Sequence, residues 1–155
     1  MIRLIDVYKG GRVARGAVEF LYELLSERPS EANISHRDMP SIEHHRQFVI
    51  RRPYRSWLIV EAEDELEPSL PVLRMGAVYL TERNEVGVAI LRRYQRRGIA
   101  RRALIAVMRH YAPLPAIPAV RPGQFVAHVN PSNAPSIALF EGLGARHIAS
   151  TYELP

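Results

Sequence analysis

The stretch EVGVAILRRYQRRGIARR, residues 85–102, decides the fold, because a predicted strand runs through it into a glycine turn and a helix. Residues 85–91 are expected to form the strand, and from Gly98 the apolar residues fall at helical spacing. A helix N-terminus presents unpaired backbone N–H groups at the positive end of the helix dipole. Small residues at 98 and 100 let a ligand approach that backbone closely. The segment therefore predicts an anion site suited to a pyrophosphate.

Arginine is concentrated in the same segment. Six members of it are arginines: Arg92, Arg93, Arg96, Arg97, Arg101 and Arg102. Basic residues outnumber acidic ones by 21 to 16 over the chain, and only Lys9 is a lysine. Because arginine binds phosphate through two hydrogen bonds, this excess favours a phosphate-bearing partner. Genome composition, or a solvated basic helix start, is the alternative, and the spacing matches neither GxxxxGK nor GxGxxG.

The remaining chain predicts alternating helices and strands. Further strands are expected at 2–8, 56–60, 72–80, 125–129 and 146–154. Further helices are expected at 12–27, at 41–52 with Ser41 as the cap, and from Asn133 to Gly144. Residues 31–40 and the proline-rich 112–123 are expected to be loops, and the acidic 61–71 an exposed connection. Hairpins come first and crossovers later, which predicts a mixed α/β sheet with helices on both faces.

Length and composition exclude several classes of protein. The 155 residues fit a single domain spanning 1–155, with 47% hydrophobic and 24% charged residues. Since cysteine is absent, disulfides, cysteine nucleophiles and thiolate metal sites are excluded. No apolar run is long enough to span a membrane, and the start lacks the apolar block of a signal peptide. A cytoplasmic location is therefore expected.

Two motifs carry a resemblance to a known family. QRRGIA, residues 95–100, resembles the Q/R-x-x-G-x-G/A motif of the GCN5-related N-acetyltransferases (GNAT superfamily), which binds the pyrophosphate of acetyl-CoA. NAPSIALFEGLGA, residues 133–145, is similar to that family's N-x-x-A/S-x-x-x-Y-x-x-x-G-F pattern. The resemblance implies a single-domain fold with a mixed, mostly antiparallel sheet, a splayed central strand pair and helices on both faces. It also implies an N-acetyltransferase, with acetyl-CoA as its acyl donor.

The resemblance assigns cofactor contacts residue by residue. The backbone of Val88, Ala89 and Ile90 would pair with the pantetheine arm. Residues 95–100 would hold the pyrophosphate: Gln95, Arg96, Arg97, Gly98, Ile99 and Ala100. Arg101 and Arg102 are candidates for the 3′-phosphate of the nucleotide, with ordinary surface positions as the alternative. Asn133 would hydrogen-bond the pantetheine, and Ser136 and Phe140 belong to the same motif.

Acyl transfer to an amine needs a base, an oxyanion donor and, in some enzymes, an acid for the leaving thiolate. Glu85 is the candidate base because it starts the strand that would carry the thioester; a solvated hairpin-end glutamate is the alternative. The family's usual acid is a tyrosine at the position of Phe140, and phenylalanine cannot donate a proton. Tyr152 is the candidate replacement, with Tyr94 and Tyr79 as alternatives.

The acceptor is expected to bind to the N-terminal half and the proline-rich loop. His36, Arg37 and His45 are the candidate contacts, although a loop histidine in water is the alternative for His36. No pair of histidines has metal-ligand spacing, so no metal is expected. The hypothesis is acetylation of a small primary amine, such as an amino sugar or sugar nucleotide. The alternatives are acylation of a protein amine or an aminated nucleobase, a silent CoA-binding module, or a nucleic-acid-binding module. Nucleic acid and membrane are not the expected partners, and a homodimer is left open.

Overall fold

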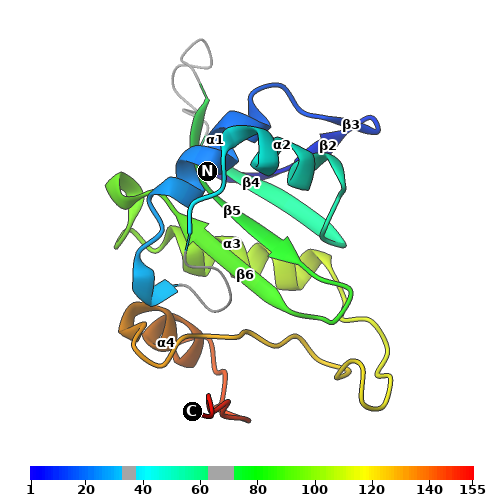
Figure 1. Ribbon diagram of the computed structural model, residues 1–155, viewed down its shortest axis with the longest axis vertical. Helices are drawn as coiled ribbons and strands as arrows, with labels where there is room; N and C mark the ends of the chain where they lie inside the picture. Colours follow the sequence, from blue (N-terminus) through cyan, green and yellow to red (C-terminus); the bar gives the residue numbers. More distant parts are fainter. Residues whose placement is uncertain (33–37, 63–71) are drawn as a thin grey trace.

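The computed structural model describes residues 1–32, 38–62 and 72–155 (Figure 1). The strands are β1 (Ile2–Asp6), β2 (Tyr8–Lys9), β3 (Arg12–Val13), β4 (Ser56–Ala62), β5 (Leu73–Leu80) and β6 (Val86–Ile90). The α-helices are α1 (Ala17–Ser26), α2 (Ile42–Ile50), α3 (Ile99–His110) and α4 (Ala134–Glu141). Short 3-10 turns cover Ser30–Ala32 (η1) and Arg92–Tyr94 (η2).

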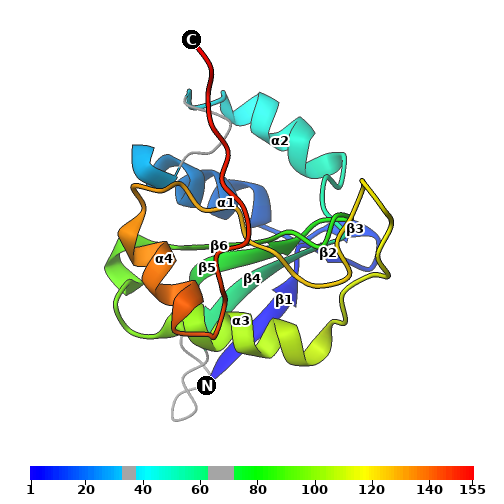
Figure 2. The same cartoon turned by 90° about the horizontal axis from the view of Figure 1, so that it is seen from below.

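One antiparallel sheet in the order β1-β4-β5-β6 forms the centre of the fold. Helices α1 and α2 lie on one face and α3 on the other, as the turned view shows (Figure 2). The α/β class, the predominantly antiparallel sheet and the helices on both faces are thus as the sequence predicts. No helix among the described residues is long and apolar enough to cross a bilayer.

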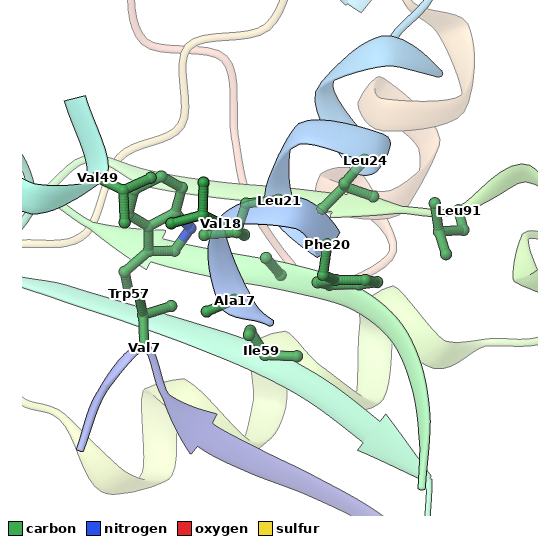
Figure 3. Packing of buried hydrophobic residues seen from close by; sticks show 11 residues of the cluster. Val7, Ala17, Val18, Phe20, Leu21, Leu24, Val49, Trp57, Ile59 and Leu91 are labelled. Atoms are coloured by element: carbon green, nitrogen blue, oxygen red, sulfur yellow. The ribbon is translucent and has the colours of Figure 1, made fainter. Parts of the chain in front are cut away.

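Strand alternation divides the core into two clusters. Side chains from one side of the sheet, including Trp57, Ile59 and Ala77, pack against α1 and α2 (Figure 3). Those from the other side, including Leu58 and Val78, pack against α3. The two faces of each strand therefore contact different helices, α1 and α2 on one side and α3 on the other.

The predicted helix 12–27 begins five residues late. Gly10 and Gly11 both have positive φ angles, 60° and 80°, and turn the chain between β2 and β3. Gly16, at φ 70°, then directs the chain into α1. Glycine reaches this left-handed region without a Cβ clash, so these three glycines place a hairpin where helical spacing alone predicts a helix. The predicted strand 2–8 is likewise shorter, as β1, with Tyr8 in the hairpin.

The acidic connection predicted at 61–71 is corrected at its start. Glu61 belongs to β4 and is only 6% exposed, and residues 63–71 lie outside the described part. Its carboxylate lies 3.2 Å from Arg74 Nε and 3.5 Å from Arg3. Arg74 also donates to the carbonyl of Arg15 beside α1. A charged residue is tolerated there because its partners come from both neighbouring strands.

The two strands predicted near the C-terminus do not form as regular strands. Residues 125–129 contribute one parallel bridge, between Glu85 and Val126, and residues 146–154 have no regular structure. The helix between them matches its prediction closely. Asn133 Oδ1 accepts the Ser136 N–H at 3.2 Å, and Gly144, at φ 87°, lets Ala145 N–H close back on the Phe140 carbonyl.

Candidate active site

The turn before α3 is an exposed row of backbone N–H groups. Arg96 and Gly98 both adopt left-handed conformations, at φ 60° and 70°, and α3 begins at Ile99. Its first intrahelical bond runs from Arg102 N–H to the Gly98 carbonyl at 3.1 Å. The N–H groups of residues 99–101 therefore have no partner in the described part of the chain, and a Cβ on Gly98 would meet nothing within 4 Å. Open space and unpaired donors at a positive dipole end fit a phosphate group.

The arginines of the turn divide into engaged and unengaged groups. Arg93 pairs with Glu23 at 2.9 Å, and Arg101 donates to the Gly142 carbonyl at 2.6 Å. Arg97 lies over the Tyr94 ring at 5.8 Å, whereas the Arg96 side chain makes no hydrogen bond, ion pair or ring contact with residues 1–32, 38–62 or 72–155. Arg101 thus ties α3 to α4, and a phosphate contact would compete with that bond.

Gln95 has a structural contact in the turn. Its side-chain Nε2 donates to the Ile90 carbonyl at 2.9 Å, closing the turn onto the end of β6. Gln95, the first residue of the QRRGIA motif, therefore fixes the conformation of the turn, whereas Gly98 leaves space for a ligand beside the backbone.

The outer edge of β6 is open beyond its first residue. Leu91 N–H and the Glu85 carbonyl bond to β5, so the odd-numbered residues of β6 face that strand. The even-numbered residues face outward, and Val86 N–H donates to the Val126 carbonyl at 2.8 Å. Past this bond, no backbone hydrogen bond in the described residues joins Val88 or Ile90 to residues 127–130. Beyond Val86 this edge of β6 is open, and the N–H and C=O of Val88 have no partner within the described residues; because no second regular strand lies beside it, the splayed strand pair stays a prediction.

Ala89 differs from its two neighbours. It is paired with Ala77 of β5, so its backbone is committed to the sheet. Of the three residues assigned to the pantetheine arm, Val88 and Ile90 have outward backbone groups, and the carbonyl of Ile90 already accepts from Gln95.

Helix α4 lies beside this edge, on the α3 side of the sheet (Figure 2). Phe140 packs with Leu139 and Leu143 against the core cluster of the α3 side, and Val88 and Ile90 pack against the same cluster. Asn133 uses its side-chain oxygen to cap α4, and Ser136 supplies the N–H that it accepts. The amide nitrogen of Asn133 is the part of its side chain left for a ligand.

The opposite face carries Tyr79 and Glu85, two of the candidate acid–base groups. Tyr79 pairs with Gly87, and a Cβ on Gly87 would lie 2.4 Å from the Tyr79 hydroxyl oxygen. The ring therefore covers β6 only because residue 87 has no side chain. Burial raises the pKa of Tyr79, and the Glu85 carboxylate adds to this, while the charge of Arg28 opposes it. A phenol with a raised pKa stays protonated at neutral pH and can act as a donor.

Tyr79 belongs to an aromatic cluster formed with Phe48, Tyr54 and Trp57. Tyr54 stacks on Tyr79 with centroids 4.2 Å apart, and Trp57 meets Tyr54 edge-on at 4.8 Å. Phe48 of α2 completes it at 6.1 Å from Trp57 and is 43% exposed. Within this cluster Phe48 is the exposed ring, whereas Trp57 is buried and Tyr54 and Tyr79 are half-buried against the core of the α1/α2 face.

Glu85 lies at the start of β6 with partners on two sides. One carboxylate oxygen is 3.5 Å from Thr81 Oγ1, and the other is 3.3 Å from Nε2 of His128. His128 is a contact that the sequence does not predict. No local pattern marks it, because the contact depends on the bridge between Val126 and Glu85, which lie far apart along the chain.

The predicted acceptor contacts are not brought together. His45 is corrected: it is 4% exposed, with its ring 5.4 Å from that of Tyr22 between α1 and α2, so no acceptor reaches it. His36 and Arg37 lie outside the described residues. Tyr152 is 84% exposed in the C-terminal segment, and no bond of its side chain is recorded. No group of three metal-ligating side chains assembles within the described residues.

The open edge of β6 leads along the chain to a helix N-terminus with N–H groups that are unpaired within the described residues. This arrangement is the one expected for the acyltransferases that use acyl-CoA, whose motifs residues 95–100 and 133–145 resemble. The family model described as acetyltransferase (GNAT) domain matches residues 13–146. The chain therefore belongs to the GNAT acetyltransferase family. Among curated proteins, no sequence matches it.

Solved structures share the fold at low identity. A domain from Methanocaldococcus jannaschii aligns with TM-score 0.74 and 18% identity, covering 99% of this chain and 93% of that one. Salmonella typhimurium yncA, solved with its cofactor acetyl-CoA, aligns at 0.61 and 19%, covering 93% and 78%. A ribosomal-protein-alanine N-acetyltransferase from Brucella melitensis aligns at 0.59 and 18%, covering 93% and 83%.

Proposed function

We propose that this protein is an acetyl-CoA-dependent N-acetyltransferase that acts on the primary amine of a small molecule. One observation carries the proposal. Within the described residues, backbone N–H groups without a protein partner occur at two places along one continuous segment, at Val88 and at residues 99–101. Membership of the GNAT family and the acetyl-CoA complex of yncA support the choice of donor.

The outer edge of β6 and the face that carries Tyr79 have different roles in this proposal: the first binds the donor, and the second carries the acid–base groups. Acetyl-CoA, when bound, supplies an acyl group activated as a thioester. The N–H groups of residues 99–101 would hold its pyrophosphate, with Arg96 free to add a charge. The outward N–H of Val88 is a donor for the negative charge that develops on the acyl oxygen. Phe140, which replaces the family's tyrosine, contributes apolar packing at the same edge.

Glu85 is the proposed base, because an amine of ordinary pKa arrives as an ammonium ion and must lose a proton before it attacks. Tyr79 is the best placed of the three candidate tyrosines to donate a proton to the leaving sulfur. It lies over Gly87 in the middle of β6, whereas Tyr152 is 84% exposed. The aromatic cluster beside it favours an acceptor with a flat apolar portion or a cationic group near a ring face.

The test is a thiol-release assay with acetyl-CoA and a panel of amines: amino sugars, polyamines, peptides and aminated nucleotides. We expect turnover with a small primary amine. Glu85→Gln should lower kcat at least about 100-fold with little change in CoA affinity, and Glu82→Gln, an exposed glutamate of the same turn, should not. Tyr79→Phe should slow turnover where Tyr54→Phe and Tyr152→Phe do not. Turnover with peptides but with no small amine would show that the acceptor is a protein amine. CoA binding without any turnover would favour a CoA-binding module that has no catalytic activity.

A further inference from the structure

His128 contacts Glu85, the proposed base. Its Nε2 lies 3.3 Å from Glu85 Oε1. The imidazole side chain is 62% exposed, whereas that of Glu85 is only 32% exposed. The pair therefore joins a more enclosed carboxylate to a group that is open to water.

The backbone fixes this pair in place. Val126 N–H donates to the Asn84 carbonyl at 2.9 Å, and Val86 N–H donates to the Val126 carbonyl. Asn84 itself is fully buried; its side chain donates to the carbonyls of Leu114 and Pro122 and accepts the Leu114 N–H. The segment that carries His128 is thus held against the strand that carries Glu85 from both ends of the connecting loop.

The same register puts the pair on the acceptor side. Residues 85 and 87 share a face of the sheet with Tyr79, because Tyr79 pairs with Gly87. Glu85 and Tyr79 therefore lie on one face of the sheet, and His128 joins them through its contact with the Glu85 carboxylate. Two further titratable groups of the described residues bear on Tyr79: Tyr54, which stacks on its ring at 4.2 Å, and Arg28, whose charge opposes the rise in its pKa.

Turnover leaves Glu85 with a proton that it must lose before the next cycle. Resting on the proposed function, we propose that His128 is the proton relay that returns Glu85 to its charged form. An N–H bond of the acceptor ammonium breaks as an O–H bond forms on Glu85. That O–H bond then breaks as an N–H bond forms at Nε2 of the neutral imidazole. The imidazolium is paired with the restored carboxylate and gives its proton to water or buffer, so one proton passes from ammonium to solvent.

His128→Ala tests the relay, with His110→Ala as the matched control because His110 is also exposed, at the far end of α3. In weak buffer, we expect His128→Ala to lower kcat about tenfold, less than loss of the base itself, with the KM for acetyl-CoA unchanged. Added imidazole should restore much of that rate in His128→Ala and none of it in Glu85→Gln. A merely structural role would not respond to imidazole. Equal melting temperatures for the wild type and His128→Ala check that the variant is folded.

Two results overturn the inference while the proposed function stands. One is an active wild type with an equally active His128→Ala variant, and the other is a loss of rate that imidazole does not relieve. If the wild-type protein binds CoA but none of the amines tested supports thiol release, the proposed function is overturned, and the relay with it.

Discussion

At the scale of single residues, we expect Gly98 to have the largest consequence for ligand binding. Its φ of 70° is strained for any side chain, yet the space around its Cβ position is empty. A carboxylate placed there would occupy the anion site and accept the helix N–H groups itself. We expect Gly98→Glu to abolish CoA binding, measured by calorimetry, at a stability cost of about 1–2 kcal/mol.

Gly10 supplies the control for this change. It has a φ of 60° and equally open surroundings, in the hairpin between β2 and β3. Gly10→Glu should therefore cost similar stability and leave CoA affinity unchanged. If both variants bound CoA as the wild type does, the turn would not be the phosphate site.

His45 gives a second prediction, on stability against pH. Burial lowers the pKa of His45, opposed by its hydrogen bond to the Val18 backbone, and its Nε2 has no recorded partner. The unfolded chain takes up this proton near pH 6.5, whereas the folded chain resists it. Stability is therefore lost as pH falls below about 6.5, by at most about 1.4 kcal/mol per pH unit, and is unaffected above.

His45→Leu should flatten this dependence in urea unfolding measured at about pH 7.5 and pH 5.5. His44→Leu, one residue earlier and exposed, should retain it. A variant at position 45 whose midpoint still falls with pH as steeply as that of the wild type would assign the dependence to another group.

At the scale of elements, the connection from α3 to α4 depends on Asn84. Its side chain makes three hydrogen bonds to backbone groups of the proline-rich loop, and its φ is 61°. We expect Asn84→Gly to cost about 2–3 kcal/mol, because those backbone groups lose their partners. Asn84→Ala should cost about 1 kcal/mol more, since alanine also strains the left-handed backbone. Equal denaturation midpoints for Asn84→Gly and the wild type would contradict this.

The elements with local signals could be predicted from the sequence. Ser41 caps α2 through its hydroxyl as predicted, and Gly98 opens α3. The elements that depend on distant partners could not. Residues 125–129 have the composition of a strand, but they pair with β6 at one bridge only. Glu61 reads as solvated in an acidic run, and only Arg3 and Arg74, from neighbouring strands, explain its burial.

The site shows the same division. The donor side follows from two local motifs, so its turn and its cap lie where the sequence places them. The acceptor side is assembled across the sheet. Tyr79 reaches β6 through a strand register, and His128 reaches Glu85 through a loop held by Asn84, so neither is visible in a local pattern. His45 failed as a contact because a helical spacing does not say which face packs inward.

At the scale of the whole molecule, the net charge of +5 raises the alternative of nucleic-acid binding. We expect CoA at about 100 times its Kd to stabilise the protein by about 2.7 kcal/mol, which raises the melting temperature by roughly 5–10 °C. Duplex DNA at physiological salt should raise it little. Thermal shifts at two salt concentrations, with Gly98→Glu as the control, separate the two ligands. A large DNA shift that disappears with salt would favour the nucleic-acid module.

The alternation along β6 also restricts how the chain can vary in length. Under the proposed function its even positions would serve the donor and its odd positions the acceptor, and the parity is set by the tight turn at 81–84. Deleting or inserting one residue there would exchange the two sets, sending Glu85 among the side chains that contact α3 and Val86 toward the amine. Homologous chains should therefore vary at the exposed positions 82 and 83, keep the buried Asn84, and change the length of this turn only in steps of two.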